Sequence, residues 1–505
     1  MNQTLSDLQN DLEDLAELAD SCGGRTWSFK SALGEHPFVN AEFESLWSEM
    51  RDLAKRLRDE ARAIETAGCD SGAAGCLPAG RQAGDPAYYA NVKREGAELL
   101  RILHGKLGYL LAAPDWQSPT FLHSLRHQAG KQVGRIVGTE NDYKRDMHLD
   151  AFAYEHAFLS EYVDAPLRLP PAAYVTVSGM AAMSTLVGLL QYEYKMRGPI
   201  VCGRGSYFEN RWILERAFRD KVHLVDEMNA DEILETVRRV RPEAVFLDTL
   251  CNTAEVAMPN LAALLPKLAR ALGPRGILVL DNSGLASSFQ PFAHMPRLGG
   301  PRLFVIESLN KFHQFGFDRV TGGIIWTQGG SPTGLLGARE HLGTNMPDAS
   351  VLSLPWPNRA LMDKRLARIG RNAQFLAERL DAFAATHPGS PLLRAVYPGL
   401  PSHPAYAWTK EHRFKGGFLA LAFKPPHARA NFYKSLIARI ISEAARRNVQ
   451  LVAGSSFGLD GTRLYLTALH ATRITTPFFR VSAGTETEEG METIAEIFKS
   501  TLERA

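Results

Sequence analysis

A lysine and an aspartate stand at the ends of apolar runs that have the composition of buried strands. Lys311 closely follows the run at 304–308, and Asp281 ends the run at 277–280. A lysine in such a place can form an imine with a carbonyl cofactor, and an aspartate one strand earlier can hold a pyridine nitrogen protonated. The pair therefore predicts pyridoxal phosphate chemistry.

Each of these residues also has an ordinary interpretation. A lysine is usually a solvated surface charge, and an aspartate after a strand often caps the next helix. Lys311, however, precedes Phe312, Phe315 and Phe317, so we expect a poorly solvated amine. Desolvation lowers the pKa of a lysine and leaves its amine free to attack a carbonyl.

From residue 173 onward, short apolar runs alternate with helical stretches, which is typical of a mostly parallel, doubly wound α/β sheet. Ligands of such sheets bind at the carboxyl ends of the strands. Ser178, Asp248, Asp281 and Ser308 all fall at such ends. The expected strands are 174–177, 199–201, 222–225, 244–247, 277–280 and 303–306, and the helical stretches between them include 181–194 and 261–272.

The turn Ser178-Gly179-Met180 joins a predicted strand to a predicted helix. Free N–H groups and the positive end of the helix dipole favour a phosphate there. A Ser-Gly turn also occurs for steric reasons alone, so this signal depends on its neighbours.

The chain divides into three expected parts. Residues 1–135 form a helical N-terminal extension with a flexible, Gly/Ala-rich loop near 67–86, and residues 136–350 form the cofactor-binding large domain. Residues 351–505 form a smaller α+β domain, with an expected strand at 418–423 and an expected helix at 430–446.

Composition narrows the classes of partner. The 57 basic and 55 acidic residues give a formal charge of +2, so no binding to nucleic acid or an anionic membrane surface is expected. Five cysteines without CxxC spacing predict neither a disulfide framework nor a metal site and fit a reducing cytoplasm. No run approaches the roughly 18 apolar residues of a membrane span.

Several segments together resemble the Cys/Met metabolism family of pyridoxal-phosphate enzymes, which have the fold-type-I, aminotransferase-like architecture. The family's SATKYLGGHSD is similar to SLNKFHQFGFD, which places the Schiff-base lysine on Lys311 and a phosphate-binding serine on Ser308. Its VVDNT resembles LDNS, which assigns the ring-nitrogen acid to Asp281, and its ETPSNP resembles DTLCNT, which assigns a contact with the phenolic oxygen to Asn252. Its SGMAA is present unchanged at 178–182.

Further matches imply the remaining site residues. Tyr143 and Arg145 resemble the family's Tyr-x-Arg, which reaches the cofactor phosphate of a neighbouring subunit and implies a homodimer or homotetramer with a shared active site. Arg480 resembles the arginine that binds the substrate α-carboxylate, and Ser456 resembles the serine of a nearby Ser-Leu-Gly. Tyr207 is the candidate for the ring-stacking tyrosine, with a buried core tyrosine as the alternative.

The resemblance implies a reaction on an amino acid in which Lys311 moves the α-proton and a group is then eliminated or replaced at the β- or γ-carbon. Tyr207 is expected to assist the leaving group. The expected substrates are a sulfur amino acid, an activated homoserine or a sulfonium compound. An aminotransferase is the alternative, and a cofactor-free scaffold of the same fold is a further one.

Some residues depart from the family pattern. Leu250 and Cys251 replace a Pro-Ser pair, Asn310 replaces a threonine, and residues 313–315 replace Leu-Gly-Gly. These changes are expected to crowd the substrate side of the site, which motivates the hypothesis of an unusual, larger substrate.

Overall fold

The structure is a computed structural model, and it describes residues 2–33, 37–69, 85–112, 149–164, 167, 169–296, 299–328, 333–467 and 476–505. Contacts divide the chain into two compact units. Unit 1 comprises Met1–Tyr154, Pro347–Trp356 and Thr487–Glu489, and unit 2 comprises Glu155–Met346, Pro357–Glu486 and Gly490–Ala505. The predicted division of the chain near residues 135 and 350 stays a prediction.

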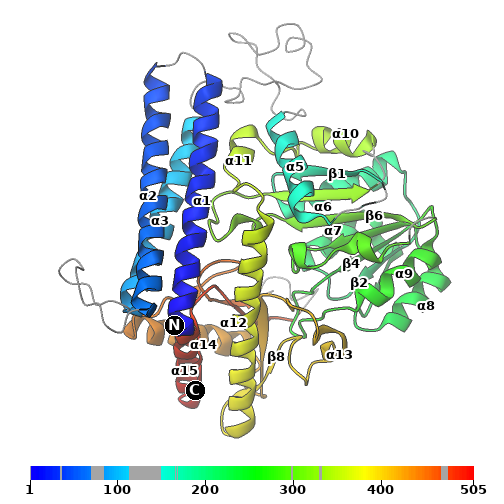
Figure 1. Cartoon of the computed structure of the whole chain (residues 1–505). Helices are drawn as coiled ribbons and strands as arrows, with labels where there is room; N and C mark the ends of the chain where they lie inside the picture. Colours follow the sequence, from blue (N-terminus) through cyan, green and yellow to red (C-terminus); the bar gives the residue numbers. More distant parts are fainter. Residues whose placement is uncertain are drawn as a thin grey trace. The chain divides into compact units, whose positions relative to one another are not determined.

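Unit 1 contains three long helices that lie side by side (Figure 1). Apolar residues at three- and four-residue spacing, such as Leu8 and Leu12, are fully buried, as expected for amphipathic helices that pack together. No helix in the described part of the chain is both long and apolar enough to cross a membrane. The predicted flexible loop lies largely outside the described residues. The helices are α1 (Gln3–Leu33), α2 (Pro37–Cys69), α3 (Pro86–Ala112) and the short α11 (Asp348–Leu352).

The larger sheet of unit 2 has the strand order β1-β7-β6-β5-β4-β2-β3. β1 and β6 pair with β7 in antiparallel fashion, and the other neighbours are parallel, so the predicted mostly parallel sheet is confirmed. The strands are β1 (Pro171–Thr176), β2 (Ile200–Gly203), β3 (Val222–Val225), β4 (Ala244–Asp248), β5 (Ile277–Asp281), β6 (Arg302–Ser308) and β7 (Gly323–Gln328).

Helices pack on this sheet through an apolar core. Phe246, Val279 and Phe304 on the strands and Leu186 and Leu214 on the helices belong to one buried cluster. The predicted helix at 181–194 is shorter, since a π-helical turn at 189–193 ends it. The helices are α5 (Leu149–Tyr162), whose second half belongs to unit 2, α6 (Gly179–Gly188), α7 (Phe208–Phe218), α8 (Ala230–Val240), α9 (Leu261–Leu272) and α10 (Thr333–His341).

The smaller sheet of unit 2 has the order β10-β11-β12-β9-β8 and is antiparallel except for the β10–β11 pair. The predicted strand at 418–423 and helix at 430–446 coincide with β9 and α14. The strands are β8 (Leu392–Val396), β9 (Phe418–Phe423), β10 (Val452–Ala453), β11 (Arg463–Thr467) and β12 (Phe478–Ser482), and the helices are α12 (Arg359–Thr386), α13 (Tyr406–Thr409), α14 (Ala430–Arg446) and α15 (Glu488–Glu503).

Candidate active site

One cavity of about 800 Å³ in unit 2 lies at the carboxyl ends of the parallel strands. Its size is within the range of about 300–1,000 Å³ that is usual for small-molecule sites. Residues of β9, β11 and β12 also line it, so both sheets of unit 2 contribute. Tyr143 and Arg145 lie outside the described residues. The other predicted site residues all line this cavity: Ser178, Gly179, Met180, Tyr207, Asn252, Asp281, Ser308, Lys311, Ser456 and Arg480.

Lys311 borders the cavity and is otherwise enclosed by protein. Its Nζ donates a hydrogen bond to Ser456 Oγ at 3.0 Å and lies 4.9 Å from the centre of the Phe457 ring. Burial, reinforced by the nearby Arg480 charge, lowers the pKa of Lys311 from 10.5 to about 8. The amine is therefore far more nucleophilic near neutral pH than a solvated lysine.

Asp281 ends β5 directly beside Asp248, the last residue of β4. Its Oδ2 accepts a hydrogen bond from Asn210 Nδ2 at 2.9 Å, and its Oδ1 accepts one from the Ser283 N–H at 3.0 Å. Burial raises the pKa of both carboxyl groups, and the proximity of Asp281 raises that of Asp248 further. Among the described residues, no basic side chain forms an ion pair with Asp281. A cationic N–H group of a ligand would stabilise its carboxylate.

The first turn of α6 approaches the end of β6 closely. A Cβ at Gly179 would lie 3.0 Å from Ser308 Cβ, so a larger residue would close the space between the helix and the strand. The Ser178 hydroxyl caps the helix by accepting a hydrogen bond from the Ala181 N–H at 3.0 Å. The free N–H groups of this turn and the Ser308 side chain border the cavity, which is the arrangement that binds phosphate at a helix N-terminus.

Arg480, on β12, supplies a buried cation on the other side of the cavity. Its Nη1 donates to Asn252 Oδ1 at 2.9 Å, and its Nη2 donates to the Ser456 carbonyl at 3.1 Å. Burial lowers its pKa to about 10, a value at which the guanidinium is still charged at neutral pH. A buried guanidinium of this kind can hold a carboxylate through a two-pronged contact.

Tyr207 immediately precedes α7, and its hydroxyl donates to Glu209 Oε2 at 3.0 Å. Burial and the Glu209 charge raise the pKa of the phenol, which therefore stays protonated at neutral pH. Tyr207 is half-buried and lines the cavity, and its ring-stacking role stays a prediction. The contacts of Glu209 and Asn210 were not predicted, although both lie within the same short segment, Ser206-Tyr207-Phe208-Glu209-Asn210.

The expected crowding by residues 313–315 is wrong. His313, Gln314 and Phe315 are buried and do not line the cavity. Leu250 and Asn310 do line it. The departures after the lysine therefore fill the protein interior, and the crowding argument for a larger substrate does not apply to them.

Comparison with known proteins identifies a matching family and a similar fungal protein. The family model described as "Cys/Met metabolism PLP-dependent enzyme" matches residues 111–492. A bifunctional enzyme, flvA, of Aspergillus flavus is 22% identical over 345 residues. That alignment covers 66% of this chain but only 39% of the fungal protein, so the chain spans well under half of that relative.

Solved structures show the same fold. A cystathionine gamma synthase from Xanthomonas oryzae pv. oryzae, in complex with cystathionine, matches with a TM-score of 0.56 and 17% identity, over 73% of this chain and 89% of that one. A cystathionine gamma-lyase from Lactobacillus plantarum, complexed with L-serine, matches with a TM-score of 0.57 and 17% identity, over 76% and 93%. At this identity the likeness concerns the fold, and the predicted fold-type-I architecture is confirmed.

Proposed function

The chain belongs to the Cys/Met metabolism family of pyridoxal-phosphate-dependent enzymes, and from this we propose that it eliminates or replaces a group at the β- or γ-carbon of an amino acid. The observation that carries the proposal is the buried Lys311 amine, which borders the same cavity as Asp281 and Arg480. Lys311 can bind the cofactor aldehyde, Asp281 can bind the cofactor ring nitrogen, and Arg480 can bind the substrate carboxylate.

The residues of the cavity fit pyridoxal phosphate. Asp281 is a buried carboxyl group without a basic partner among the described side chains, as a site for a pyridine N–H requires. Because Gly179 has no side chain, the first turn of α6 and Ser308 lie close together at the edge of the cavity, where both can contact one anion. Lys311 would hold the cofactor covalently, Asp281 its ring nitrogen, and Ser178, Gly179, Met180 and Ser308 its phosphate.

The side chains around the cavity can then take different roles in the reaction. Pyridoxal phosphate supplies an electron sink for a carbanion at the substrate α-carbon. Arg480 would bind the α-carboxylate, and the Lys311 amine, with its pKa of about 8, would take up the α-proton. Because the Tyr207 phenol stays protonated and lies against Glu209, it is suited to give a proton to a departing group.

The proposed substrates are a sulfur amino acid, an activated homoserine or a sulfonium compound. Leu250 and Asn310, which replace other residues of the family pattern, line the cavity and are positioned to affect this choice. Both the synthase and the lyase among the similar structures share the fold, so replacement and elimination are both compatible with it.

A panel assay tests the proposal. The purified protein, supplied with pyridoxal phosphate, is incubated with candidate amino acids while ammonia, keto acid and released thiol are measured. Wild-type protein should release ammonia or thiol, or form a replacement product when a nucleophile is added, and Lys311→Ala should do neither. Accumulation of pyridoxamine phosphate would instead identify an aminotransferase.

The matched control is Lys434→Ala, since Lys434 is an exposed lysine that also lines the cavity. This control should keep its activity. Borohydride reduction followed by peptide mass analysis should place the cofactor on Lys311. Full turnover by Lys311→Ala, or trapping on another lysine, would refute the assignment.

We also propose that the protein is a cytoplasmic homo-oligomer with a shared active site. The resemblance of Tyr143 and Arg145 to the family's phosphate-binding pair from a neighbouring subunit supports the oligomer. The free thiols of Cys22, Cys202 and Cys251, all buried, are compatible with a reducing compartment. Mixing a Lys311→Ala protein with an Arg145→Ala protein should restore activity if subunits share the site.

A further inference from the structure

Beside the candidate cofactor ligands, Glu307, which also belongs to the lining of the cavity, carries a buried carboxylate. Side chains alternate between the two faces of a strand, so the Glu307 side chain points away from the side that Ser308 takes. It contacts Asn282, the residue that follows the end of β5. Glu307 is 3% exposed and Asn282 is 1% exposed. A carboxylate so deeply buried requires hydrogen-bond donors around it.

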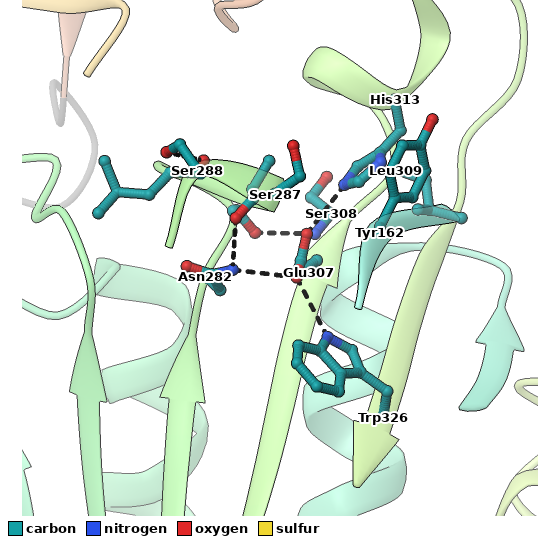
Figure 2. Close-up of polar contacts among 12 residues, drawn as sticks. Tyr162, Asn282, Ser287, Ser288, Glu307, Ser308, Leu309, His313 and Trp326 are labelled. Atoms are coloured by element: carbon teal, nitrogen blue, oxygen red, sulfur yellow. Dashed lines mark hydrogen bonds and ion pairs between the residues drawn. The ribbon is translucent and has the colours of Figure 1, made fainter. Parts of the chain in front are cut away.

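Three side chains supply those donors (Figure 2). Glu307 Oε1 accepts from Asn282 Nδ2 at 3.1 Å and from Trp326 Nε1 at 3.1 Å. Glu307 Oε2 lies 2.9 Å from His313 Nε2. The donors come from the end of β5, from β7 and from the turn after Lys311, so one carboxylate joins three separate segments.

The proton in the contact with His313 can be placed from its surroundings. The His313 ring is 2% exposed, and the Phe158 and Tyr162 rings lie 5.5 and 5.2 Å from it. Its Nδ1 has no hydrogen-bond partner in the described part of the protein. A lone pair at Nδ1 is less costly to bury than an unpaired N–H group, so His313 donates through Nε2 and Glu307 accepts.

The turn that carries Lys311 needs such support. Phe315 and Asp318 adopt positive φ angles of 49°, a region that side-chain-bearing residues rarely occupy. Such conformations persist only where the surrounding structure holds them. Gln314 holds the turn from within by accepting from the Arg319 N–H at 2.8 Å and by donating to the Val320 carbonyl at 2.5 Å.

The hydrogen-bond partners of the Glu307 carboxylate lie next to both candidate cofactor ligands in the sequence. Asn282 directly follows Asp281, and His313 lies two residues after Lys311. In addition, the Ser308 N–H donates to Ser283 Oγ at 2.7 Å, which links the ends of β5 and β6 on either side of the network. Loss of the Glu307 carboxylate would therefore release the two loops together.

We propose that Glu307 is a positioning residue, which fixes the loop of Asp281 and the turn of Lys311 at the separation that pyridoxal phosphate requires. Glu307 acts through Asn282, Trp326 and His313 and takes no part in proton transfer to the substrate. This role rests on the proposed assignment of Lys311 and Asp281 as cofactor ligands. It also accounts for a histidine at position 313, where the family pattern has leucine.

The test compares cofactor binding by Glu307→Leu, Glu307→Gln and wild-type protein. The leucine variant keeps the volume but leaves the buried Trp326 Nε1 and His313 Nε2 groups without their acceptor and removes one acceptor of Asn282 Nδ2, which keeps the Ala286 carbonyl. Its dissociation constant for pyridoxal phosphate should rise about 10- to 100-fold, the scale seen when groups that orient ligands are removed. The glutamine variant keeps an acceptor for Asn282 and Trp326, and it should bind within about threefold of wild type. The visible spectrum of the bound cofactor should change in the leucine variant and be restored in the glutamine variant.

A second variant and a control separate positioning from general destabilisation. His313→Phe removes only the hydrogen bond between Glu307 and the turn that follows Lys311. This variant keeps the proposal testable if Glu307→Leu does not fold. It should weaken cofactor binding by about tenfold. Thr409→Val removes a comparable buried hydrogen bond, from Thr409 Oγ1 to the Pro398 carbonyl at 2.6 Å, at a place that does not line the cavity. All proteins are compared at a temperature at which each is folded.

Two results have different meanings. If wild-type protein does not carry the cofactor on Lys311, the proposed function fails and the positioning role fails with it. If wild-type protein does so, but Glu307→Leu and His313→Phe bind the cofactor as tightly as Thr409→Val and give an unchanged spectrum, only the positioning role is overturned.

Discussion

Replacing Lys311 by methionine should stabilise the cofactor-free protein while abolishing its chemistry. The lysine is held in a place that disfavours its charge, because burial and the Arg480 guanidinium lower its pKa from 10.5 to about 8. At pH 7 the folded protein must therefore carry a charged amine in an unfavourable environment or lose the proton. Methionine has a similar length and no charge, so it removes this cost.

The magnitude follows from the shift in pKa. One pKa unit corresponds to about 1.4 kcal/mol, so the change from 10.5 to about 8 corresponds to about 3 kcal/mol at pH 7. Partial exposure of Lys311 to the cavity makes this an upper value. Methionine also loses the hydrogen bond to Ser456 Oγ, which is worth about 1 kcal/mol. The expected net gain is about 2 kcal/mol in the free energy of unfolding.

The difference in the free energy of unfolding between wild type and Lys311→Met should depend on pH. The folded pKa of Lys311 lies below the unfolded one, so the unfolded state binds more protons between pH 8 and 10.5. The stability of wild-type apoprotein should therefore rise through that window relative to Lys311→Met. Above the window the advantage of methionine should be gone, and the lost hydrogen bond to Ser456 Oγ should leave wild type the more stable protein by about 1 kcal/mol. Below pH 8 the difference should be constant.

Urea denaturation of the two apoproteins, followed from pH 7 to 10.5, measures this difference. Lys434→Met is the control, because Lys434 is an exposed lysine at the same cavity and should change the stability by less than about 0.5 kcal/mol. If Lys311→Met is no more stable than wild type at pH 7, and the difference does not change with pH, then the Lys311 amine is not desolvated and the reasoning about its reactivity fails.

Two further substitutions test the substrate side of the cavity. Arg480→Leu removes the guanidinium that is expected to bind the α-carboxylate, so kcat/KM for an amino acid should fall by about 100-fold, whereas Arg480→Lys should lose less; steady-state kinetics showing equal values for all three proteins would contradict that role. Tyr207→Phe should lower kcat about 100- to 10,000-fold for substrates with a poor leaving group and much less for those with a good one. Glu209→Gln keeps a hydrogen-bond acceptor for Tyr207 and should fall between Tyr207→Phe and wild type, and an equal loss for good and poor leaving groups would exclude proton donation by Tyr207.

The positions at which the strands end were predictable from the sequence, because they depend on the local pattern of apolar residues. Runs of apolar residues marked β5 and β6 as buried on both faces, and Asp281 and Lys311 follow them in the chain. In a parallel sheet all such ends lie at one edge, so the two side chains had to approach each other. The smaller sheet was less constrained, although β9 and α14 were predicted with their observed bounds.

Contacts between distant segments could not be read in this way. Arg480 Nη1 reaches Asn252 Oδ1 across 228 positions of the chain, and this contact depends on how β12 meets the loop after β4. Glu307 interrupted an apolar run, Phe304-Val305-Ile306, but nothing in the sequence specified its donors. The direction of residues 313–315 was mispredicted for the same reason, since adjacency to Lys311 does not say which face a side chain takes.

The sequence by itself determined the type of sheet, the positions of its strand ends and the candidate residue for binding a cofactor aldehyde, because the spacing of apolar residues and the order of motifs are properties of the chain. Only the tertiary structure decided the pKa of Lys311, the protonated state of the Tyr207 phenol and the partners of Glu307. These properties depend on burial and on neighbours brought together by folding, and both follow from packing in three dimensions.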